Sequence, residues 1–377
     1  MPPHCASPKS AQVTAQTASF TPVRSRLLAV LPLLAAVSQA IWMACPTPVH
    51  GQSGPIAKLT GTGYESIVYA DTLSAPHATA TDGSGNIYYS DWITNTVYRE
   101  SPGPNGFTQI PVASFGKDTP SAIAVDQFND VFVVVLTDLP NGGSLNGVLY
   151  EESYVEYCGG TGCTPGWTQS VIPTTGLLAP MGLAVAIDNR TLNANYIFIA
   201  DTGNNRVVQL FGQLPLEGYV QSTLPFSGLS APEGLAVDAN LSLYIADTGN
   251  SRVLKEKYSL NGPSYSQSVI GSGLSAPGAV AVQAGTGSVA IADTGNKRIL
   301  FEQLSGSTYT QEVIPTPGLA PTPNGVAFNT NGQVVVTELN PQQVVEEQFG
   351  ASPIDFGQVS AGTTSAAASL VFTFNGP

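Results

Sequence analysis

The hexapeptide IADTGN occurs three times in the chain, at 199–204, 245–250 and 291–296. Successive copies are 46 residues apart, and repetition at a period of this length indicates a repeat architecture. A second mark, a small residue followed by Pro, opens an apolar segment ahead of each copy and also recurs elsewhere. It is found in SAPHATATD (74–82), TPSAIAVD (119–126), APMGLAVAID (179–188), SAPEGLAVD (230–238), SAPGAVAVQ (275–283) and TPNGVAFN (322–329). The chain therefore contains six copies of one unit.

Each unit has the pattern of four short strands separated by turn residues. In the fourth unit, GLAVD (234–238) and LYIAD (243–247) are almost continuously apolar, whereas RVLKEK (252–257) and YSQSVI (265–270) alternate with polar residues. Continuous apolar strands are typical of sheets covered on both faces, and alternation is typical of strands nearer the solvent. Helical periodicity is absent, and the repeat is too long for a β-helix. Six such units, each packed on its neighbours, predict a β-propeller.

The ends of the repeat region predict how the ring closes. The sixth unit stops at its third strand, QVVEEQ (343–348), and YESIVYAD (64–71) precedes the first unit in the position of a fourth strand. Pairing of these two segments would remove the open sheet edges. The sequence thus predicts an all-β fold: a six-bladed β-propeller of four-stranded antiparallel blades over 54–350, closed by an N-terminal strand.

Two stretches resemble known families. APEGLAVD (231–238) followed by LYIADTGNSRVLK (243–255) is similar to the NHL repeat, whose units build six-bladed propellers. The resemblance implies this fold more specifically than any function, because NHL propellers include protein-interaction and RNA-binding modules, kinase sensor domains, lyases and lactonase-like enzymes. The segment 351–377, with its FGQVSAGTTS motif, resembles the first strands of an immunoglobulin-like module and is expected to be a partial module or tail.

The residues shared by the repeats are expected to serve the structure. Asp ends an apolar strand, Gly and Asn follow it, and Arg begins the next strand. We expect the Asp side chains to accept hydrogen bonds from nearby backbone N–H groups, the Gly to adopt positive φ, and the Arg to pair with carboxylates. A ring of carboxylates that binds cations is the alternative. The residues concerned are Asp91, Asp201, Asp247, Asp293, Arg206, Arg252 and Arg298, with Glu338 at the corresponding position of the sixth unit.

The position directly after each Pro mark differs from unit to unit. It is occupied by His77, Ser121, Met181, Glu233, Gly278 and Asn324. In a propeller this position begins the innermost strand and faces the central channel, on the side of the DTGN turns. The five residues with side chains are therefore predicted to form a ligand-binding ring at the channel mouth. The alternative is that they are solvated loop residues.

Charge excludes one class of partner. The formal net charge is −13, with 26 acidic and 13 basic residues. Binding to nucleic acid depends on neutralising phosphates, so we expect neither a nucleic-acid partner nor binding to an anionic membrane surface.

The N-terminal segment 1–53 has the pattern of a secretory signal. Arg24 and Arg26 precede the apolar run LLAVLPLLAAVSQAIWMA (27–44), and small residues follow. Cleavage after Ala40 or near Gln52 predicts a protein that is secreted, periplasmic or at the cell surface, without a membrane span in the mature chain. A retained membrane anchor, or lipid attachment at Cys45, is the alternative.

The cysteines are consistent with export. Cys158 and Cys163 lie in an insertion between the third and fourth strands of the second unit and are predicted to form a disulfide. A metal-binding pair is the alternative. Tyr154, Tyr157 and Trp167 in the same insertion are expected to make it a contact loop.

Residues of the types that commonly act in catalysis are few in this chain. Only His4, His50 and His77 are present, so a zinc site of several histidines in the propeller is excluded, and no GxSxG motif accompanies His77. We predict a monomeric, non-catalytic binding module for a protein, peptide or glycan, without a resident cofactor or metal. The alternative is a metal-dependent lactonase-like hydrolase or lyase, with a divalent cation held in the channel near Glu233 and Asn324. A structural spacer is a third hypothesis.

Overall fold

A computed structural model describes residues 58–59, 64–70, 73–103, 106–137, 145–159, 162–188, 194–213, 218–259, 264–314, 322–340 and 342–349. All of them belong to one compact unit, Gly54–Ala351. The predicted signal sequence, the alternatives at its end and the immunoglobulin-like tail lie outside the described residues. No helix in the described ranges has the length and apolar character that crossing a membrane requires.

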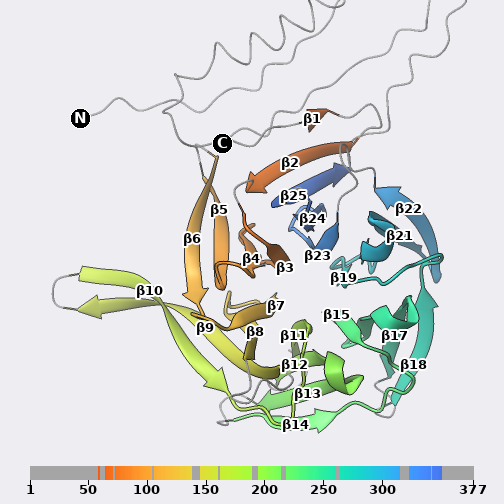
Figure 1. Cartoon of the computed structure of the whole chain (residues 1–377), viewed down its shortest axis with the longest axis horizontal. Helices are drawn as coiled ribbons and strands as arrows, with labels where there is room; N and C mark the ends of the chain where they lie inside the picture. The colour runs from red at the N-terminus through yellow and green to blue at the C-terminus, as the bar shows by residue number, and fades with distance from the viewer. Residues whose placement is uncertain are drawn as a thin grey trace, which may run out of the picture. The chain divides into compact units, whose positions relative to one another are not determined.

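The described strands form six antiparallel sheets arranged as blades around a central axis (Figure 1). Blade 1 contains β3 (Pro76–Thr81), β4 (Ile87–Asp91), β5 (Thr96–Gly103) and β6 (Gly106–Ser114), and blade 2 contains β7 (Thr119–Val125), β8 (Val131–Thr137), β9 (Asn146–Gly159) and β10 (Gly162–Ile172). Blade 3 contains β11 (Gly182–Asp188), β12 (Ala194–Asp201), β13 (Arg206–Gln213) and β14 (Val220–Thr223). Blade 4 contains β15 (Pro232–Val237), β16 (Leu243–Asp247), β17 (Arg252–Ser259) and β18 (Ser264–Ile270). Blade 5 contains β19 (Ala279–Val282), β20 (Val289–Asp293), β21 (Arg298–Ser305) and β22 (Thr308–Ile314).

The sixth blade joins the two ends of the repeat region. It consists of β23 (Pro323–Phe328), β24 (Val334–Leu339), β25 (Gln342–Phe349), β2 (Tyr64–Ala70) and the short β1 (Lys58–Leu59). Strand β2 pairs with β25 from Tyr64 opposite Phe349 to Ala70 opposite Val344. The predicted six-bladed propeller and its closure by an N-terminal strand are therefore confirmed.

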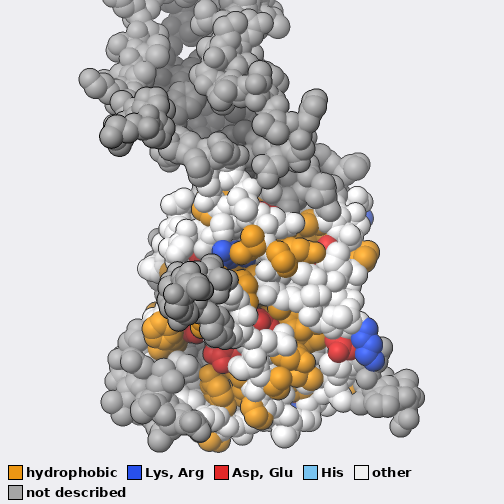
Figure 2. Space-filling view, turned by 90° about the vertical axis from the view of Figure 1, so that its left-hand side faces the viewer, with side chains coloured by type: hydrophobic (Ala, Val, Ile, Leu, Met, Phe, Trp, Pro, Cys, Tyr) orange, Lys and Arg blue, Asp and Glu red, His pale blue; other side chains and the backbone are white. Residues whose placement is uncertain are grey.

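Burial explains why each blade has the polarity pattern seen in the sequence. Every residue of β4, β16 and β20 is buried, because these second strands are covered by a neighbouring blade on each side. One apolar cluster joins Phe198 and Val207 of blade 3 to Leu235 and Ile245 of blade 4. The outermost strands β18 and β22 are mostly exposed, and only the last residue of each is buried. Few charged side chains cover the flank shown in Figure 2.

The repeated turns are single turns of 3₁₀-helix: η2 (Thr202–Asn204), η3 (Thr248–Asn250) and η4 (Thr294–Asn296). In η3, the buried Asp247 carboxylate accepts hydrogen bonds from the Ser230 backbone N–H at 2.7 Å, Asn250 Nδ2 at 2.8 Å and Arg252 Nε at 2.6 Å. Asp201 and Asp293 bind the corresponding three groups. The turn therefore ties the blade to the loop that leads into it, and the carboxylates are occupied by the protein itself.

One expectation for the turn is wrong. The positive φ falls on the residue after the TGN triplet, at Asn205, Ser251 and Lys297, and not on the Gly. The Gly is required by close approach: a Cβ at Gly249 would lie 2.5 Å from Ser230 Oγ and 2.7 Å from Ser230 O. The turn is thus in close contact with the loop at Ser230, whose backbone N–H binds the Asp247 carboxylate.

The Thr of the triplet makes a contact that sequence reasoning missed. Thr248 Oγ1 donates a hydrogen bond to the Pro277 carbonyl of the next blade at 2.7 Å, and Thr294 Oγ1 donates to the Pro323 carbonyl at 2.7 Å. In blade 1, Trp92 replaces this Thr and its Nε1 donates to the Pro120 carbonyl at 2.9 Å. The repeated turn therefore also links adjacent blades, through the Pro carbonyl at or near the start of the next innermost strand.

Candidate functional site

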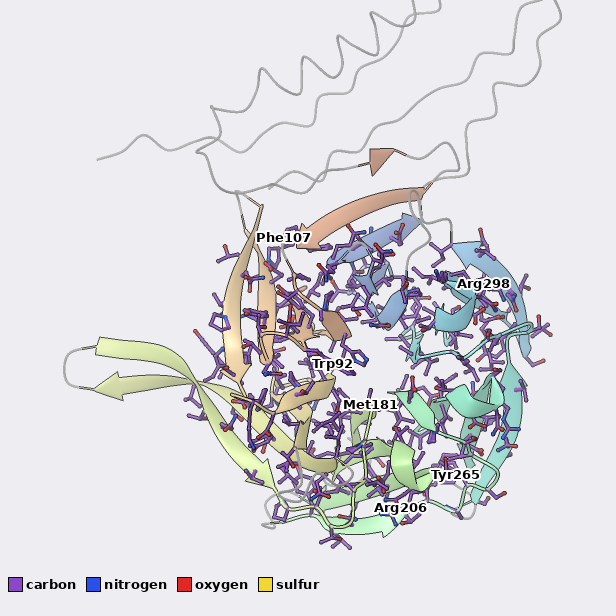
Figure 3. The ribbon with its side chains drawn as sticks, viewed as in Figure 1. Trp92, Phe107, Met181, Arg206, Tyr265 and Arg298 are labelled. Atoms are coloured by element: carbon purple, nitrogen blue, oxygen red, sulfur yellow. The ribbon has the colours of Figure 1, made fainter. Side chains whose placement is uncertain are left out.

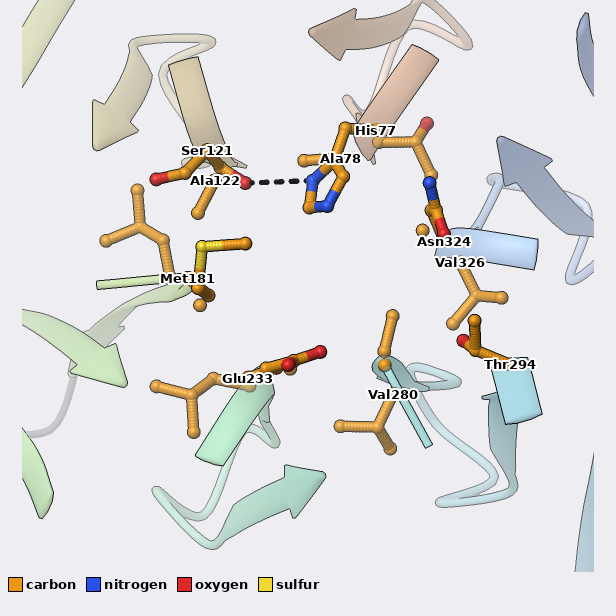
Figure 4. Close-up of a pocket in the computed structure, with 18 of the residues that line it drawn as sticks. His77, Ala78, Ser121, Ala122, Met181, Glu233, Val280, Thr294, Asn324 and Val326 are labelled. Atoms are coloured by element: carbon orange, nitrogen blue, oxygen red, sulfur yellow. Dashed lines mark hydrogen bonds between the residues drawn. The ribbon is translucent and has the colours of Figure 1, made fainter. Parts of the chain in front are cut away.

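A cavity of about 290 Å³ lies in the central channel, at the end that carries the repeated turns (Figure 4). Each blade contributes residues from the start of its innermost strand. The lining comprises 77–79, 121–123, 181–183, 233–235, 278–280 and 324–326, together with Thr248, Ala276 and Thr294. The position after each Pro mark thus lines one common cavity. Met181 and Trp92 lie toward the centre of the ring, whereas Arg206 and Arg298 lie farther out (Figure 3).

Local irregularities in the innermost strands place several of these residues. In blade 4 the register passes from Pro232 opposite Asp247 to Leu235 opposite Ile245, so Glu233 lies in a bulge. The same shift occurs at His77 in blade 1, at Ser121 in blade 2 and at Asn324 in blade 6. A bulge removes a residue from the strand pairing and can redirect its side chain. The four irregularities thus fall at positions of the channel ring.

Ser121 belongs to the ring, but its side chain does not face the cavity. It is fully buried, and its Oγ lies 2.8 Å from the Pro180 carbonyl and 3.2 Å from the Val134 carbonyl. The hydroxyl is therefore engaged within the protein. We correct its expected role from ligand contact to a link between blades 2 and 3.

His77 is held in one orientation. Its ring stacks on Trp92 with centroids 3.9 Å apart, and Nδ1 lies 3.2 Å from the Ser121 carbonyl. A carbonyl only accepts hydrogen bonds, so Nδ1 carries the proton and Nε2 of the neutral ring is an acceptor. Burial lowers the pKa of His77 to about 4, which outweighs the opposing effect of the Ser121 hydrogen bond. The ring is therefore neutral at pH 7.

Among the described residues, Glu233 is the only carboxylate of the cavity lining. Its side chain is half-buried and makes no hydrogen bond or ion pair with any residue in the described ranges. Burial raises the pKa of Glu233. A carboxylate that is partly desolvated and lacks a partner in the described ranges is unusual in a folded protein, and such groups are candidates for contact with a ligand.

Gly278 keeps a space open in front of this carboxylate. A Cβ added at Gly278 would lie 2.8 Å from Thr294 Oγ1, 3.7 Å from Glu233 Oε2 and 3.8 Å from the Asn324 carbonyl oxygen. These are the three nearest atoms outside Gly278 and its chain neighbours. Three oxygens from three blades therefore lie close together beside Gly278.

The rest of the lining is largely apolar. Leu183, Leu235, Val280 and Val326 form part of it and are themselves buried. Met181 adds a flexible thioether that adapts to different ligand shapes. The cavity thus offers apolar surface beside a small group of hydrogen-bond acceptors, which is the usual composition of a small-ligand site.

The predicted cysteine pair lies on the hairpin of β9 and β10, which projects from blade 2 (Figure 1). Cys163 is directly opposite Cys158 in the register of the two strands. Directly opposed residues of an antiparallel pair have Cα separations that suit a disulfide. On the same hairpin, Tyr154 is 43% exposed and its ring lies against Trp167 and the Arg99 guanidinium.

The sequence analysis did not identify Thr248 and Thr294, which line the cavity, or Trp92, which stacks on His77. Trp92 breaks the DTGN pattern in blade 1, and this departure is the signal that would have pointed to it. Thr294 belongs to an unbroken DTGN repeat and carries no such signal.

Comparison with known proteins supports the fold and the repeat. The family model described as NHL repeat matches residues 229–255. A search of curated proteins finds no match. Among solved structures, the chain is similar to a gluconolactonase from Xanthomonas campestris at 14% identity and a TM-score of 0.51, covering 80% of this chain and 99% of that chain. It is also similar to a glucose dehydrogenase at 14% identity and a TM-score of 0.51, covering 76% and 99% of the two chains. Identities this low show a shared fold alone. The protein is a six-bladed β-propeller whose residues 229–255 match the NHL repeat.

Proposed function

We propose that the protein is an exported binding module that takes a group of a peptide, protein or glycan ligand into its channel cavity. One observation carries the proposal: His77, Met181, Glu233 and Asn324 differ from one another at equivalent positions, yet line the same cavity. The residues that hold the blades together are repeated, whereas the residues of this ring are not. Export rests on the signal-like sequence at 24–44.

The electrostatics of the cavity support binding more directly than catalysis. His77 Nε2 and the ionised Glu233 carboxylate are both hydrogen-bond acceptors, and no Lys or Arg among the described residues is in the lining. A ligand that supplies donors would satisfy groups that the protein leaves unmatched.

Binding to peptide and glycan arrays tests the proposal. Glu233→Gln and Met181→Ala should each weaken the captured signal, because both side chains line the cavity. Glu312→Gln makes the same chemical change on the exposed outer strand β22 and should leave the signal unchanged. Equal binding by all variants would place the ligand elsewhere on the molecule.

A metal-dependent lactonase-like hydrolase or lyase is the second candidate. It is favoured by the Glu233 carboxylate and Asn324, which line the same cavity. Among the described residues, no group of three or more His, Cys, Asp or Glu is placed to hold a metal, so a cation would depend on Asn324 and neutral oxygens. Hydrolysis of simple lactones that requires a divalent cation and is abolished by Glu233→Gln would establish this function in place of the first.

A further inference from the structure

We propose that blade 5 contains a pH-sensitive clasp, in which the Gln311 amide exchanges between Ser272 of the loop that enters the blade and the Glu302 carboxylate. This device goes beyond the proposed binding function. Equivalent glutamines of other blades show the two arrangements separately. The loop at Ser272 continues into Ala276 and Gly278, which line the cavity.

In blade 5 the Gln311 side chain holds the entering loop. Gln311 Oε1 accepts hydrogen bonds from the Ser272 backbone N–H at 2.8 Å and from Ser272 Oγ at 3.1 Å, and Gln311 Nε2 donates to the Ser272 carbonyl at 3.3 Å. Blade 3 has the same arrangement, in which Gln221 binds the Thr175 N–H and carbonyl, each at 2.8 Å. The residue opposite Gln221 in the strand register is Leu210, so this glutamine has no carboxylate opposite it.

In blades 2 and 4 the equivalent glutamines bind a glutamate instead. Gln169 Nε2 donates to Glu152 Oε1 at 2.6 Å, and Gln267 Nε2 donates to Glu256 Oε1 at 2.7 Å. In both blades the Glu lies directly opposite the Gln in the register of the third and fourth strands. Ser227 is available at the matching position of the loop that enters blade 4, but within the described residues Gln267 does not bind it. The same position of the repeat thus adopts two arrangements.

Blade 5 offers both partners to one glutamine. Glu302 lies directly opposite Gln311, just as Glu256 lies opposite Gln267. The Glu302 side chain is buried, and its Oε1 has no hydrogen-bond partner among the described residues while Gln311 is bound to Ser272. Burial raises the pKa of Glu302. The arrangement in the structure suits the protonated carboxyl, because a buried carboxylate without a donor is much more costly.

No neighbouring charge would take the place of Gln311. Val289 lies opposite Glu302 in β20, and a Cβ at Gly271 of the entering loop would lie 3.1 Å from Glu302 Oε1. None of the charged or titratable groups on the facing strands binds Glu302 within the described residues. These groups are Lys255 and Lys257 of β17, Tyr244 of β16, Tyr309 and Glu312 of β22, and Arg298, which pairs with Asp293. Lys255 Nζ donates to the Tyr309 hydroxyl at 3.3 Å instead.

Ionisation of Glu302 reverses the preference of the glutamine. As the pH rises through the raised pKa of Glu302, the carboxylate requires a donor. Gln311 Nε2 supplies it by adopting the arrangement that Gln267 has in blade 4. The Ser272 segment then loses its three hydrogen bonds to Gln311. The clasp is therefore closed in acid and opens as the pH rises.

NMR spectra of the purified protein with 15N-labelled glutamine side chains, recorded from about pH 4 to about pH 8, test the exchange. Gln221 is a control in the same spectrum, because Leu210 lies opposite it and leaves it no second partner. The two resonances are assigned from the spectra of Gln311→Ala and Gln221→Ala. We expect the Gln311 amide resonance to titrate while the Gln221 resonance stays constant. A Gln311 resonance as constant as that of Gln221 would overturn the proposal.

Three variants identify the group that titrates. Glu302→Gln removes the ionisation, and Glu302→Leu reproduces the pairing of blade 3, so both should abolish the titration of Gln311. Glu256→Gln makes the same chemical change in blade 4 and should leave that titration unchanged. A thermal melt verifies that each variant is folded. Titration of Gln311 that persists in folded Glu302→Gln protein would also overturn the proposal.

Hydrogen exchange of the Ser272 N–H gives the size of the effect. The matched reference is the Thr175 N–H, which binds Gln221 at the same distance of 2.8 Å. After correction for intrinsic exchange rates, protection of Ser272 relative to Thr175 should fall about five-fold or more as the pH rises, the effect of losing one hydrogen bond. In Glu302→Gln the ratio should stay constant. A constant ratio in the wild-type protein would contradict opening of the clasp.

Discussion

The buried Asp247 carboxylate offers a quantitative test of the repeated turn. Asp247→Ala removes the acceptor of three hydrogen bonds, from the Ser230 N–H, Asn250 Nδ2 and Arg252 Nε. Asn250 and Arg252 each keep a second bond, to the Gly228 carbonyl. The Ser230 N–H loses its charged acceptor, and such bonds contribute about 1.5–3 kcal/mol.

The ion pair between Arg252 and Asp247 contributes less to the free energy of unfolding. The Arg252 side chain is 31% exposed, so water replaces part of the lost interaction and about 0.5–1 kcal/mol is expected. The total loss of unfolding free energy is then about 2–4 kcal/mol. For a propeller of this size that corresponds to a fall in Tm of about 3–6 °C.

Differential scanning calorimetry or a urea melt measures this loss. Asp118→Ala is a matched control, because Asp118 lies in a turn of blade 1 and its side chain makes no hydrogen bond or ion pair within the described residues. We expect the control to melt within about 1 °C of the wild-type protein. A similarly small change for Asp247→Ala would refute the assignment of the repeated Asp to blade stability.

Three more predictions follow from individual residues. Gly249→Ala brings a Cβ within 2.7 Å of the Ser230 carbonyl and should destabilise the fold by about 2 kcal/mol or more in a denaturant melt; an unchanged midpoint would contradict the close approach. Burial raises the pKa of Glu338 to about 7, so its native state binds a proton that the unfolded chain releases near pH 4.5. The free energy of unfolding should therefore fall by up to about 3 kcal/mol as the pH rises from 4.5 to 7. In Glu338→Gln this dependence on pH should be weaker. Mass spectrometry of the unreduced protein should show Cys158 and Cys163 protected from iodoacetamide and alkylated only after reduction; alkylation without reductant would rule out the disulfide.

The fold was predictable from the sequence because every blade repeats the same pattern of apolar and polar residues. Each blade needs two strands that are buried on both faces, and segments such as LYIAD (243–247) show this directly as uninterrupted apolar residues. The displaced fourth strand at 64–70 was also evident, since the count of strands left one missing in the last unit. The positions of the channel ring followed from the same repeat.

The chemistry of the site could be predicted from the sequence less completely than the fold. Ser121 and Glu233 occupy equivalent positions in the repeat, but the Ser121 hydroxyl turns to a carbonyl of the next blade while Glu233 remains without a partner in the described ranges. Likewise, Gly249 was expected to serve backbone conformation, yet it is Gly because a neighbouring loop touches it.

Sequence alone determined the number of blades, the order of their strands and the closure of the ring, because these depend on local polarity patterns that recur with a fixed period. The tertiary structure decided which ring residues face the cavity and which oxygens lie close together beside Gly278. Those oxygens come from Glu233, Thr294 and Asn324 in three different blades. Their separation is set by how the blades pack around the axis, and no pattern within a single repeat contains that distance.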